Sequence, residues 1–422
     1  MPHRGHTRHM MKRSLTLLVA LLASASAWAA DPPDHPITLS EALTIARAEN
    51  PTLRAARAHT SAVQAGEITA ALRPNPVFTS SNEDFNPWNF EPATTQEFTQ
   101  NVAFLIERGG KRQARINDAR LTTAVAESAL HDSERQLELQ VKLAFVNYLL
   151  SSDTLKLAEQ NLHGYGQVIE ANQVRLKAGD ISQTDFDRIK IEEASFESDV
   201  LNARTSMLQA RSQLAVLLGF ADASKLSITG QLSPSPVSES LGQLQQAALE
   251  HRPDYLAAHE NVQKSEADLK LAHAYGATDV SVGPEYKRNG PDNTFGIVFQ
   301  LPLRVFDRNQ GEKLRTSHET ESSHYAEQAT RLQVLSDVQQ AWDAYQAALE
   351  RHNLYTSDYL QRSQAVLDRL TFSYQHGATS LLDYLDAIRS HRDVQLGALS
   401  ADAQALAAIH QLSFATATEL LP

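Results

Sequence analysis

Apolar side chains recur every seventh residue along the first half of the chain, which predicts a very long helix. No proline interrupts residues 111–176, and the repeating positions are Val141, Tyr148, Leu155, Leu162, Ile169 and Leu176. Seven-residue spacing is typical of coiled coils. At about 1.5 Å per residue such a helix extends for about 100 Å, longer than a usual globular helix. A turn at 178–182 is predicted to reverse the chain into a second helix over 183–219.

The chain is internally repeated, and the repeat predicts a second hairpin. Residues 141–148 resemble 338–345 at an offset of 197, and residues 179–186 resemble 377–384 at an offset of 198. Self-similarity at a fixed offset indicates tandem structural units. The second hairpin is therefore expected to consist of a helix over 309–375, a turn at 376–379 and a helix over 380–420.

Shorter elements precede each hairpin, and four of them are predicted to be strands. A short helix over 38–50 is followed by one that begins at Pro51, a residue suited to a first helical turn, and ends near Arg73. Alternating apolar and polar side chains then indicate half-buried strands. The expected strands cover 77–84 and 95–106 in the first repeat, and 279–288 and 294–304 in the second.

Four such strands need partners. A half-apolar strand of about 9–11 residues fits a bilayer, but a closed membrane barrel needs about eight strands. An open sheet edge in lipid leaves backbone groups without hydrogen bonds. Several chains would then have to share one barrel, and three chains would supply about twelve strands. The alternative is a small soluble sheet that caps a helical bundle.

The predicted domain order begins with a removable leader. Residues 1–29 have the features of a signal peptide, because the basic pair Lys12-Arg13 precedes an apolar core over 15–27. That core is too short to cross a bilayer as a helix. Beyond it, the expected units are a first repeat over 30–230, a proline-containing linker over 231–238 and a second repeat over 239–422.

Composition narrows the classes of function. There are 38 Lys and Arg against 50 Asp and Glu, a net charge of −12, which argues against a nucleic-acid partner. Cysteine is absent, which excludes disulfides, thiolate metal sites and a lipidated N-terminal cysteine. No His-Glu-x-x-His, Gly-x-Ser-x-Gly or phosphate-loop motif occurs, so neither an enzyme nor a cofactor is predicted. His318 and His324 would not share a helix face, so no metal site is predicted either.

Several motifs resemble one family of membrane proteins. They are Arg73–Pro76, Glu107–Arg112, Leu301–Gly311 and Gly377–Ala387. Over residues 37–422 the chain resembles the TolC family of trimeric outer-membrane efflux channels, most of all the branch that serves cation-exporting pumps of the cobalt–zinc–cadmium type. The resemblance implies a mainly α-helical protein in which twelve strands from three chains form an outer-membrane β-barrel and the long hairpins form a periplasmic α-barrel.

The resemblance also implies partners and a role. The homotrimer would dock on a periplasmic adaptor (a membrane fusion protein) and an inner-membrane pump of the resistance-nodulation-division type, as a passive exit duct for heavy-metal cations. Some members of this branch carry a lipidated N-terminal cysteine that this chain lacks, so the barrel alone would hold it in outer-membrane lipid. Two alternatives stay open: a duct for drugs or type I protein secretion, and a periplasmic coiled-coil adaptor or scaffold.

Glycine and serine mark both hairpin turns. Each glycine is expected to end one helix in the left-handed conformation, and each serine–aspartate pair has the spacing of an N-terminal cap for the next helix. These residues are Gly179, Ser182 and Asp185 in the first turn, and Gly377, Ser380 and Asp383 in the second.

An acidic pair in the second turn is the candidate gate. In the resemblance the turns lie at the periplasmic tip, and Asp383 and Asp386 match the acidic pair that lines its closed entrance. Three copies would place six carboxylates near the axis, and such a ring attracts cations and repels anions. Helix capping alone would equally account for Asp383, and a solvated helix face is the alternative for Asp386.

A second candidate region lies where strand becomes helix. It combines basic residues, which are expected at the periplasmic membrane surface, with glycines, which would let the backbone bend from sheet into helix. A structural role is predicted for this set, which comprises Arg108, Gly109, Gly110, Lys111, Arg112, Asp307, Arg308, Asn309 and Gly311.

Overall fold

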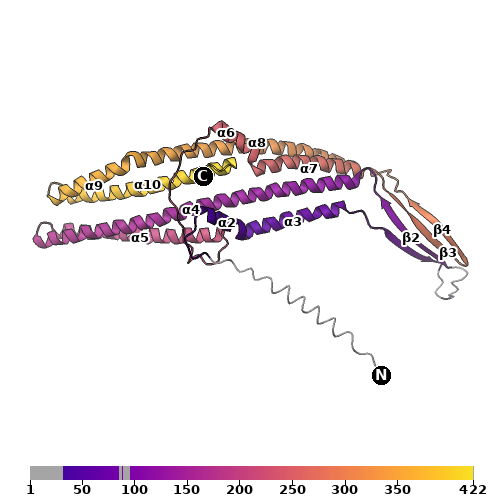
Figure 1. The fold of residues 1–422 in the computed structure, drawn as a ribbon, viewed down its shortest axis with the longest axis horizontal. Coiled ribbons are helices and arrows are strands. Elements are labelled where there is room, and N and C mark those ends of the chain that lie inside the picture. The colour runs from indigo at the N-terminus through magenta and orange to yellow at the C-terminus, as the bar shows by residue number, and fades with distance from the viewer. Residues whose placement is uncertain (1–31, 85–87, 89–95, 422) are drawn as a thin grey trace, which may run out of the picture. The chain divides into compact units, whose positions relative to one another are not determined.

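The computed structural model describes residues 32–84, 88 and 96–421. The predicted signal peptide lies outside the described residues, as does most of the loop between the first two strands. The described chain is mostly helical and contains one four-stranded sheet (Figure 1), which confirms a mainly α fold with a small strand component. None of the helices within these residues combines the length and the apolar character needed to cross a bilayer.

The chain folds into two compact units, each assembled from three separate segments. Unit 1 comprises Met1–Pro51, Gln140–Ser233 and His352–Leu406, and unit 2 comprises Thr52–Leu139, Pro234–Arg351 and Ala407–Pro422. Each unit draws on both halves of the chain, so these units differ from the predicted sequence repeats. The division into repeats and the linker between them stay predictions.

Unit 1 consists of helical hairpins. An apolar cluster of Tyr165, Ile189, Phe196 and Leu385 joins the first hairpin to the second. The short helix before them begins at a capping box, in which a Glu41 carboxylate oxygen accepts the Thr38 N–H at 2.8 Å. The helices are α2 (Leu39–Glu49), α4 (Lys111–Ala178), α5 (Gln183–Leu217), α9 (Leu360–Gln375) and α10 (Leu381–Thr416), of which α4 and α10 continue into unit 2.

One stretch of the second long helix departs from α-helical geometry. The sequence predicts a single helix over 309–375, whereas the structure has α8 (Gln310–Leu354), a π-helical turn η1 (Tyr355–Tyr359) and α9 in one continuous run. A π turn contains one residue more than an α turn, and the apolar pattern does not reveal the extra residue. Gly397 of α10 makes room for it, because a Cβ there would lie only 2.6 Å from the Tyr355 Oη.

Unit 2 has its own apolar core. Helix α6 (Leu241–His251), α8 and the end of α10 bury a cluster that includes Leu244, Val334, Val338, Tyr345, Ile409 and Leu412, each at most 1 % exposed. Burying one such side chain stabilises the fold by about 1.5–3 kcal/mol. The Tyr345 hydroxyl oxygen accepts the Val237 N–H at 2.8 Å and so ties the segment before α6 to this core. Helices α3 (Pro51–Ala71) and α7 (Pro253–Tyr275) also lie in this part of the chain.

The four strands of unit 2 form one antiparallel sheet in the order β1-β2-β3-β4. They are β1 (Val77–Glu83), β2 (Glu97–Ile106), β3 (Val280–Asn289) and β4 (Asp292–Gln300). The prediction of a strand over 294–304 is wrong at both ends. Pro302 has no N–H to donate, so pairing stops at Gln300, and the hairpin turn is confined to Gly290 and Pro291.

The strand register brings one end of every strand to the helices. Val77 begins β1, Ile106 pairs with Val280 where β2 ends and β3 begins, and Ser281 pairs with Gln300 at the end of β4. Figure 1 shows these ends meeting the helices of the same unit. The connections between strands and helices therefore lie together at one edge of the sheet.

Two strands approach each other closely at Gly283 of β3. A Cβ at this position would collide with the carbonyl oxygen of Val102 in β2. The neighbouring Pro284 has no N–H, and both residues pair with β4 while the described pairs between β2 and β3 skip them. This local gap in pairing explains how an inner strand accommodates a proline.

Candidate functional site

The two hairpin turns of unit 1 have the same construction. Gly179 and Gly377 have φ angles of 82° and 72°, the left-handed conformation that glycine adopts without strain. The Ser182 Oγ accepts the Asp185 N–H at 3.1 Å and donates to the Asp185 carboxylate at 2.8 Å. Each turn therefore ends one helix and caps the next.

The cap in the second turn includes one of the two candidate gate residues. The Ser380 Oγ accepts the Asp383 N–H at 3.2 Å and donates to Asp383 Oδ2 at 2.7 Å. These hydroxyl contacts, from Ser380 first and Thr379 second, hold the pKa of Asp383 below its usual value. The carboxylate is exposed and stays ionised, so capping leaves its charge available to a passing ion.

The second gate residue, Asp386, is exposed and lies near an arginine that the sequence analysis missed. Hydrogen bonds to Glu192 raise the pKa of Arg389, and the charge of Asp386 raises it further. Asp386 and Arg389 are three residues apart, so they lie on neighbouring positions of one helix face. Asp386 therefore lies beside a positive charge on its own helix.

Arg389 joins the two hairpins of unit 1. Its Nε donates to the Glu192 carboxylate at 2.8 Å, and a second nitrogen donates to the other oxygen of the same group. Glu192 is buried, and its hydrogen bonds to Arg389 lower its pKa. Two parallel bonds between a guanidinium and a carboxylate form a strong, directional pair. One turn farther on, Arg392 donates to Asp199 at 3.1 Å.

Aromatic side chains make further links between the hairpins nearer the turns. The buried Tyr374 of α9 donates its hydroxyl proton to Asn172 Oδ1 of α4 at 2.9 Å. The Arg175 guanidinium lies 4.7 Å from the centre of the Tyr374 ring, and the Tyr384 ring stacks on Tyr374 at 4.7 Å. A cation over an aromatic ring is attracted by the ring quadrupole. The tip is thus held by polar and aromatic contacts as well as by apolar ones.

The ion pair and its neighbour join residues that lie almost one repeat apart in the sequence. Glu192 and Arg389 are 197 residues apart, as are Ser195 and Arg392, which also contact each other. Around these residues the repeat offset is 198, because residues 179–186 resemble 377–384, so the two members of each pair are one residue out of register between the halves. Aligning the halves matches Glu192 with Ser390 instead, so the alignment alone does not identify the ion pair.

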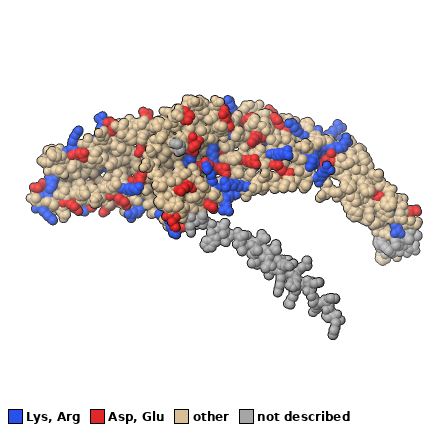
Figure 2. Space-filling model, viewed as in Figure 1, with Lys and Arg blue, Asp and Glu red and all other residues tan. Residues whose placement is uncertain are grey.

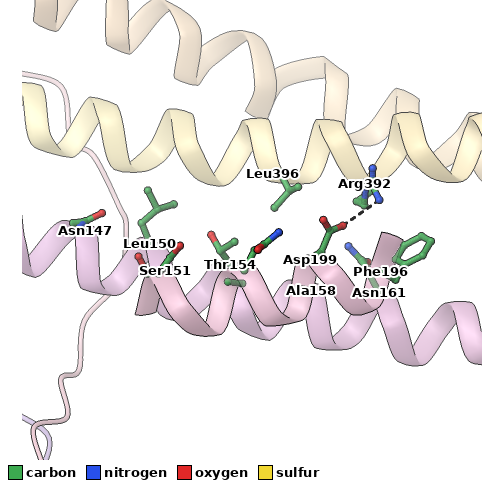
Figure 3. A pocket seen from close by; sticks show the side chains of 13 residues that line it. Asn147, Leu150, Ser151, Thr154, Ala158, Asn161, Phe196, Asp199, Arg392 and Leu396 are labelled. Carbon is green, nitrogen blue, oxygen red and sulfur yellow. Dashed lines mark hydrogen bonds and ion pairs between the residues drawn. The ribbon is translucent and has the colours of Figure 1, made fainter. Parts of the chain in front are cut away.

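A cavity lies beside these ion pairs in unit 1. It encloses about 390 Å³ and is lined by side chains of α4, α5 and α10. Figure 3 shows Asp199 of α5 reaching toward Arg392 of α10 along its wall. Amide and hydroxyl groups of Asn147, Ser151 and Thr154 share the lining with apolar side chains such as Leu150 and Leu396, so the wall is of mixed character.

The first strand-to-helix junction is built around a carboxylate that the sequence analysis missed. Asp279, just before β3, accepts the Arg108 N–H at 2.9 Å and pairs with the Lys111 Nζ at 2.6 Å. Lys111 is 2 % exposed, so its expected position on the membrane surface is wrong. A buried ammonium needs a charged partner, and Asp279 supplies it. Gly109 and Gly110, both with a φ of 73°, provide the bend.

The second junction bends at a different residue from the one expected. Gly311 lies in the first turn of α8, and the positive φ, 62°, belongs to Asn309. Asparagine adopts this left-handed conformation more readily than most residues, because its short polar side chain can form hydrogen bonds with backbone groups. Here the Asn309 Nδ2 donates to the Ala272 carbonyl at 2.7 Å, and the Asp307 carboxylate accepts the Asn309 N–H at 2.8 Å.

A pair of carboxyl groups in unit 2 should make stability depend on pH. Burial, a hydrogen bond with Asp268 and the charge of Asp268 together raise the pKa of Asp118 to about 6. The folded state therefore keeps a proton that the unfolded chain releases near pH 4, and stability falls as pH rises from about 4 to 6. We expect Asp118→Asn to raise the free energy of unfolding by about 1–2 kcal/mol above pH 6, allowing for partial exposure, and to change it little near pH 4.

Thermal unfolding at pH 4 and pH 8 would measure this effect. The exposed Asp187→Asn serves as the control, and it should leave the pH dependence unchanged. An equal response of the two variants at both pH values would contradict the assignment to Asp118.

The histidines singled out in the sequence do not form a metal site. His318 lies 3.6 Å from Glu321, while Glu319 pairs with Arg315. Within the described part of the chain, no group of three or more His, Cys, Asp or Glu side chains is arranged to hold a metal ion.

The chain matches the model of one protein family and is similar in sequence to several known proteins. The family model described as outer membrane efflux protein matches residues 42–220 and 244–418. Cobalt-zinc-cadmium resistance protein CzcC of Cupriavidus metallidurans is 27 % identical over 357 residues, which is 84 % of each chain. Cation efflux system protein CusC of Escherichia coli K12 is 23 % identical over 318 residues, 71 % of this chain and 68 % of CusC.

The chain is also similar to a solved structure and to a protein whose name indicates another role. A crystal structure of CusC superposes with a TM-score of 0.76 and 20 % identity, covering 93 % of this chain and 95 % of that one. It shows the same fold. Alkaline protease secretion protein AprF of Pseudomonas aeruginosa is 25 % identical over 245 residues, 53 % of this chain and 47 % of AprF.

Proposed function

Because the chain belongs to the outer membrane efflux protein family, we propose that it forms the outer-membrane exit duct of a tripartite efflux system for heavy-metal cations. The similarity to CzcC carries this proposal, because it extends over 84 % of both chains. A duct needs no catalytic group, and relatives in this family are named as efflux and secretion proteins rather than as enzymes.

The duct is proposed to be a trimer with a shared barrel of twelve strands. β1 and β4 are the edge strands of the described sheet, and each leaves one row of backbone groups unpaired. Such edges cannot remain open in lipid. Pairing β4 of one chain with β1 of the next closes the barrel after three copies, at four strands each.

The helical part is proposed to lie in the periplasm. There it would meet a periplasmic adaptor and, through it, an inner-membrane pump of the resistance-nodulation-division type. The contacts between the hairpins of unit 1 would then hold the closed end of the duct.

Asp383 and Asp386 are proposed to line that closed end and to favour cations. Two features support this role. Both carboxylates are exposed, and the hydroxyls around Asp383 keep it ionised. Cation channels commonly use rings of Asp or Glu side chains for selectivity.

Replacing both carboxylates should weaken cation selectivity. Water and salt screen these exposed charges, so removing the ring is expected to cost a passing cation about 1 kcal/mol of attraction in total, and Asp383→Asn with Asp386→Asn should lower the cation-to-anion permeability ratio about fivefold. Reversal potentials of single channels in planar bilayers under a salt gradient measure this ratio. Asp180→Asn in the first turn, also exposed, is the matched control. An unchanged ratio in the double variant would rule out a selectivity role.

The cargo is tested in cells. A strain that lacks the gene should become sensitive to zinc, cobalt or cadmium salts, and the wild-type gene should restore growth. The similarity to AprF favours protein secretion as the second candidate. Normal metal tolerance together with loss of a secreted protein would replace the metal proposal with that one.

A further inference from the structure

Arginines and exposed apolar side chains gather where the sheet meets the helices of unit 2. Figure 2 shows Lys and Arg side chains clustered at this end of the sheet. We call this group the rim. It comprises Arg73, Arg108, Arg112, Arg304 and Arg308, together with Leu303, Val305 and Phe306.

The strand register places these residues at one level. Arg73 precedes β1, Arg108 follows β2, and Arg304 follows β4. The corresponding ends of these strands all lie at the helical edge of the sheet. Arginines that are far apart in the sequence therefore lie together in one band along the helical edge of the sheet.

The apolar part of the rim is exposed and lies outside regular structure. Leu303 is 80 % exposed, Val305 60 % and Phe306 90 %. They directly continue β4, whose Phe295 and Ile297 are also exposed. A segment in which such side chains alternate with arginine is typical of the boundary between lipid tails and head groups.

The acidic side chains near the rim already have partners. Asp279 binds Lys111, and Glu107 binds Arg115. The carboxylate of Asp307 accepts the N–H of Asn309. That hydrogen bond leaves the charge of Asp307 in place, but the five arginines of the rim outnumber it, so the rim presents net positive charge. The opposite end of the sheet differs, because Glu83, Asp84 and Asp292 are exposed there.

We propose that the rim binds anionic phospholipids of the periplasmic leaflet of the outer membrane. This inference rests on the proposed function, which places the sheet in that membrane. Phe306, Val305 and Leu303 lie at the top of the acyl chains, and Arg304 and Arg308 bind phosphate oxygens. A guanidinium binds phosphate through two parallel hydrogen bonds, and a negative lipid surface attracts each basic residue beside it. The lipid would thereby anchor a chain that has no lipidated cysteine.

Lipid affinity of the purified oligomer tests the proposal. Native mass spectrometry would compare phosphatidylglycerol with phosphatidylethanolamine of the same acyl chains. The double variant Arg304→Gln with Arg308→Gln is expected to bind phosphatidylglycerol about 25-fold more weakly, about fivefold for each arginine, with a smaller loss for phosphatidylethanolamine, because its ammonium group offsets the phosphate charge. Lys287→Gln with Arg288→Gln, at the opposite end of the sheet, is the matched control and should bind as the wild type does. Equal phosphatidylglycerol affinity in the two double variants would overturn the proposal.

A second variant separates lipid binding from contact between subunits. Phe306→Ser should reduce the number of retained phosphatidylglycerol molecules while the mass of the oligomer stays unchanged. Dissociation of the oligomer by this substitution would assign Phe306 to a subunit contact and overturn its role at the lipid. Lipid binding without any ion conductance would instead contradict the proposed function and leave the rim assignment standing.

Discussion

Arg389→Glu should open the tip of the channel and raise its conductance at least tenfold. In the wild type the Arg389 guanidinium holds the buried Glu192 carboxylate through two hydrogen bonds, and Asp386 lies near Arg389. The substitution would leave Glu192 buried and facing a second carboxylate. Breaking a fully buried pair costs about 3–5 kcal/mol, and we expect about 2 kcal/mol here because Arg389 is 44 % exposed.

Three copies turn this modest change into a large one. About 2 kcal/mol in each of three chains sums to about 6 kcal/mol, and a shift of about 5.5 kcal/mol moves a two-state equilibrium from 1:99 to 99:1. Single-channel recording measures the result directly. The charge swap Glu192→Arg with Arg389→Glu should restore low conductance, whereas Arg389→Lys should have an intermediate effect because it offers no fork of donors. A wild-type conductance in Arg389→Glu would show that the pair does not hold the closed state.

Gly283→Val should prevent assembly of the sheet and reduce the amount of trimer in the outer membrane at least tenfold. A Cβ at this position would collide with the Val102 carbonyl oxygen, and a backbone atom cannot move aside as a flexible side chain can. Strands β2 and β3 would have to separate, which would leave backbone groups of both unpaired. In lipid each such group costs several kcal/mol.

Gly296 of β4 provides a matched control. It is also a strand glycine, but a Cβ added there meets nothing within 4 Å. Gly296→Val should therefore assemble at close to the wild-type level, and valine also suits a strand better than glycine does. The quantity of heat-resistant trimer in outer-membrane fractions measures both variants. Equal assembly of the two would contradict the close approach at Gly283.

Long helices were predictable because their signals are local and repeated. The seven-residue spacing of apolar side chains and the glycines in the turns gave helices that match α4, α5 and α10 within a few residues. The strand end at Gln300 was missed, although Pro302 carried the signal for it. The local pattern of apolar and polar residues therefore predicts whether a segment is a helix or a strand more reliably than it predicts where that segment ends.

The contacts that define the candidate site were beyond local pattern. Asp279 and Lys111 are 168 residues apart, so no spacing rule joins them. Glu192 and Arg389 are 197 residues apart, and no local spacing joins them either. The cap at Asp383 was predicted because serine and aspartate are three residues apart there. What the sequence could not supply was which helix faces pack together.

The π-helical turn has a consequence for how sequences of this kind can vary in length. Each residue advances an α-helix by about 100°, so the extra residue in η1 sets the angular phase of everything that follows it. Removing one residue from Tyr355–Tyr359 would leave α9 helical but would rotate Tyr374 away from Asn172. The π-helical turn thus sets the rotation of α9 about its own axis. Deleting a single residue there would turn a different face of α9 toward α4.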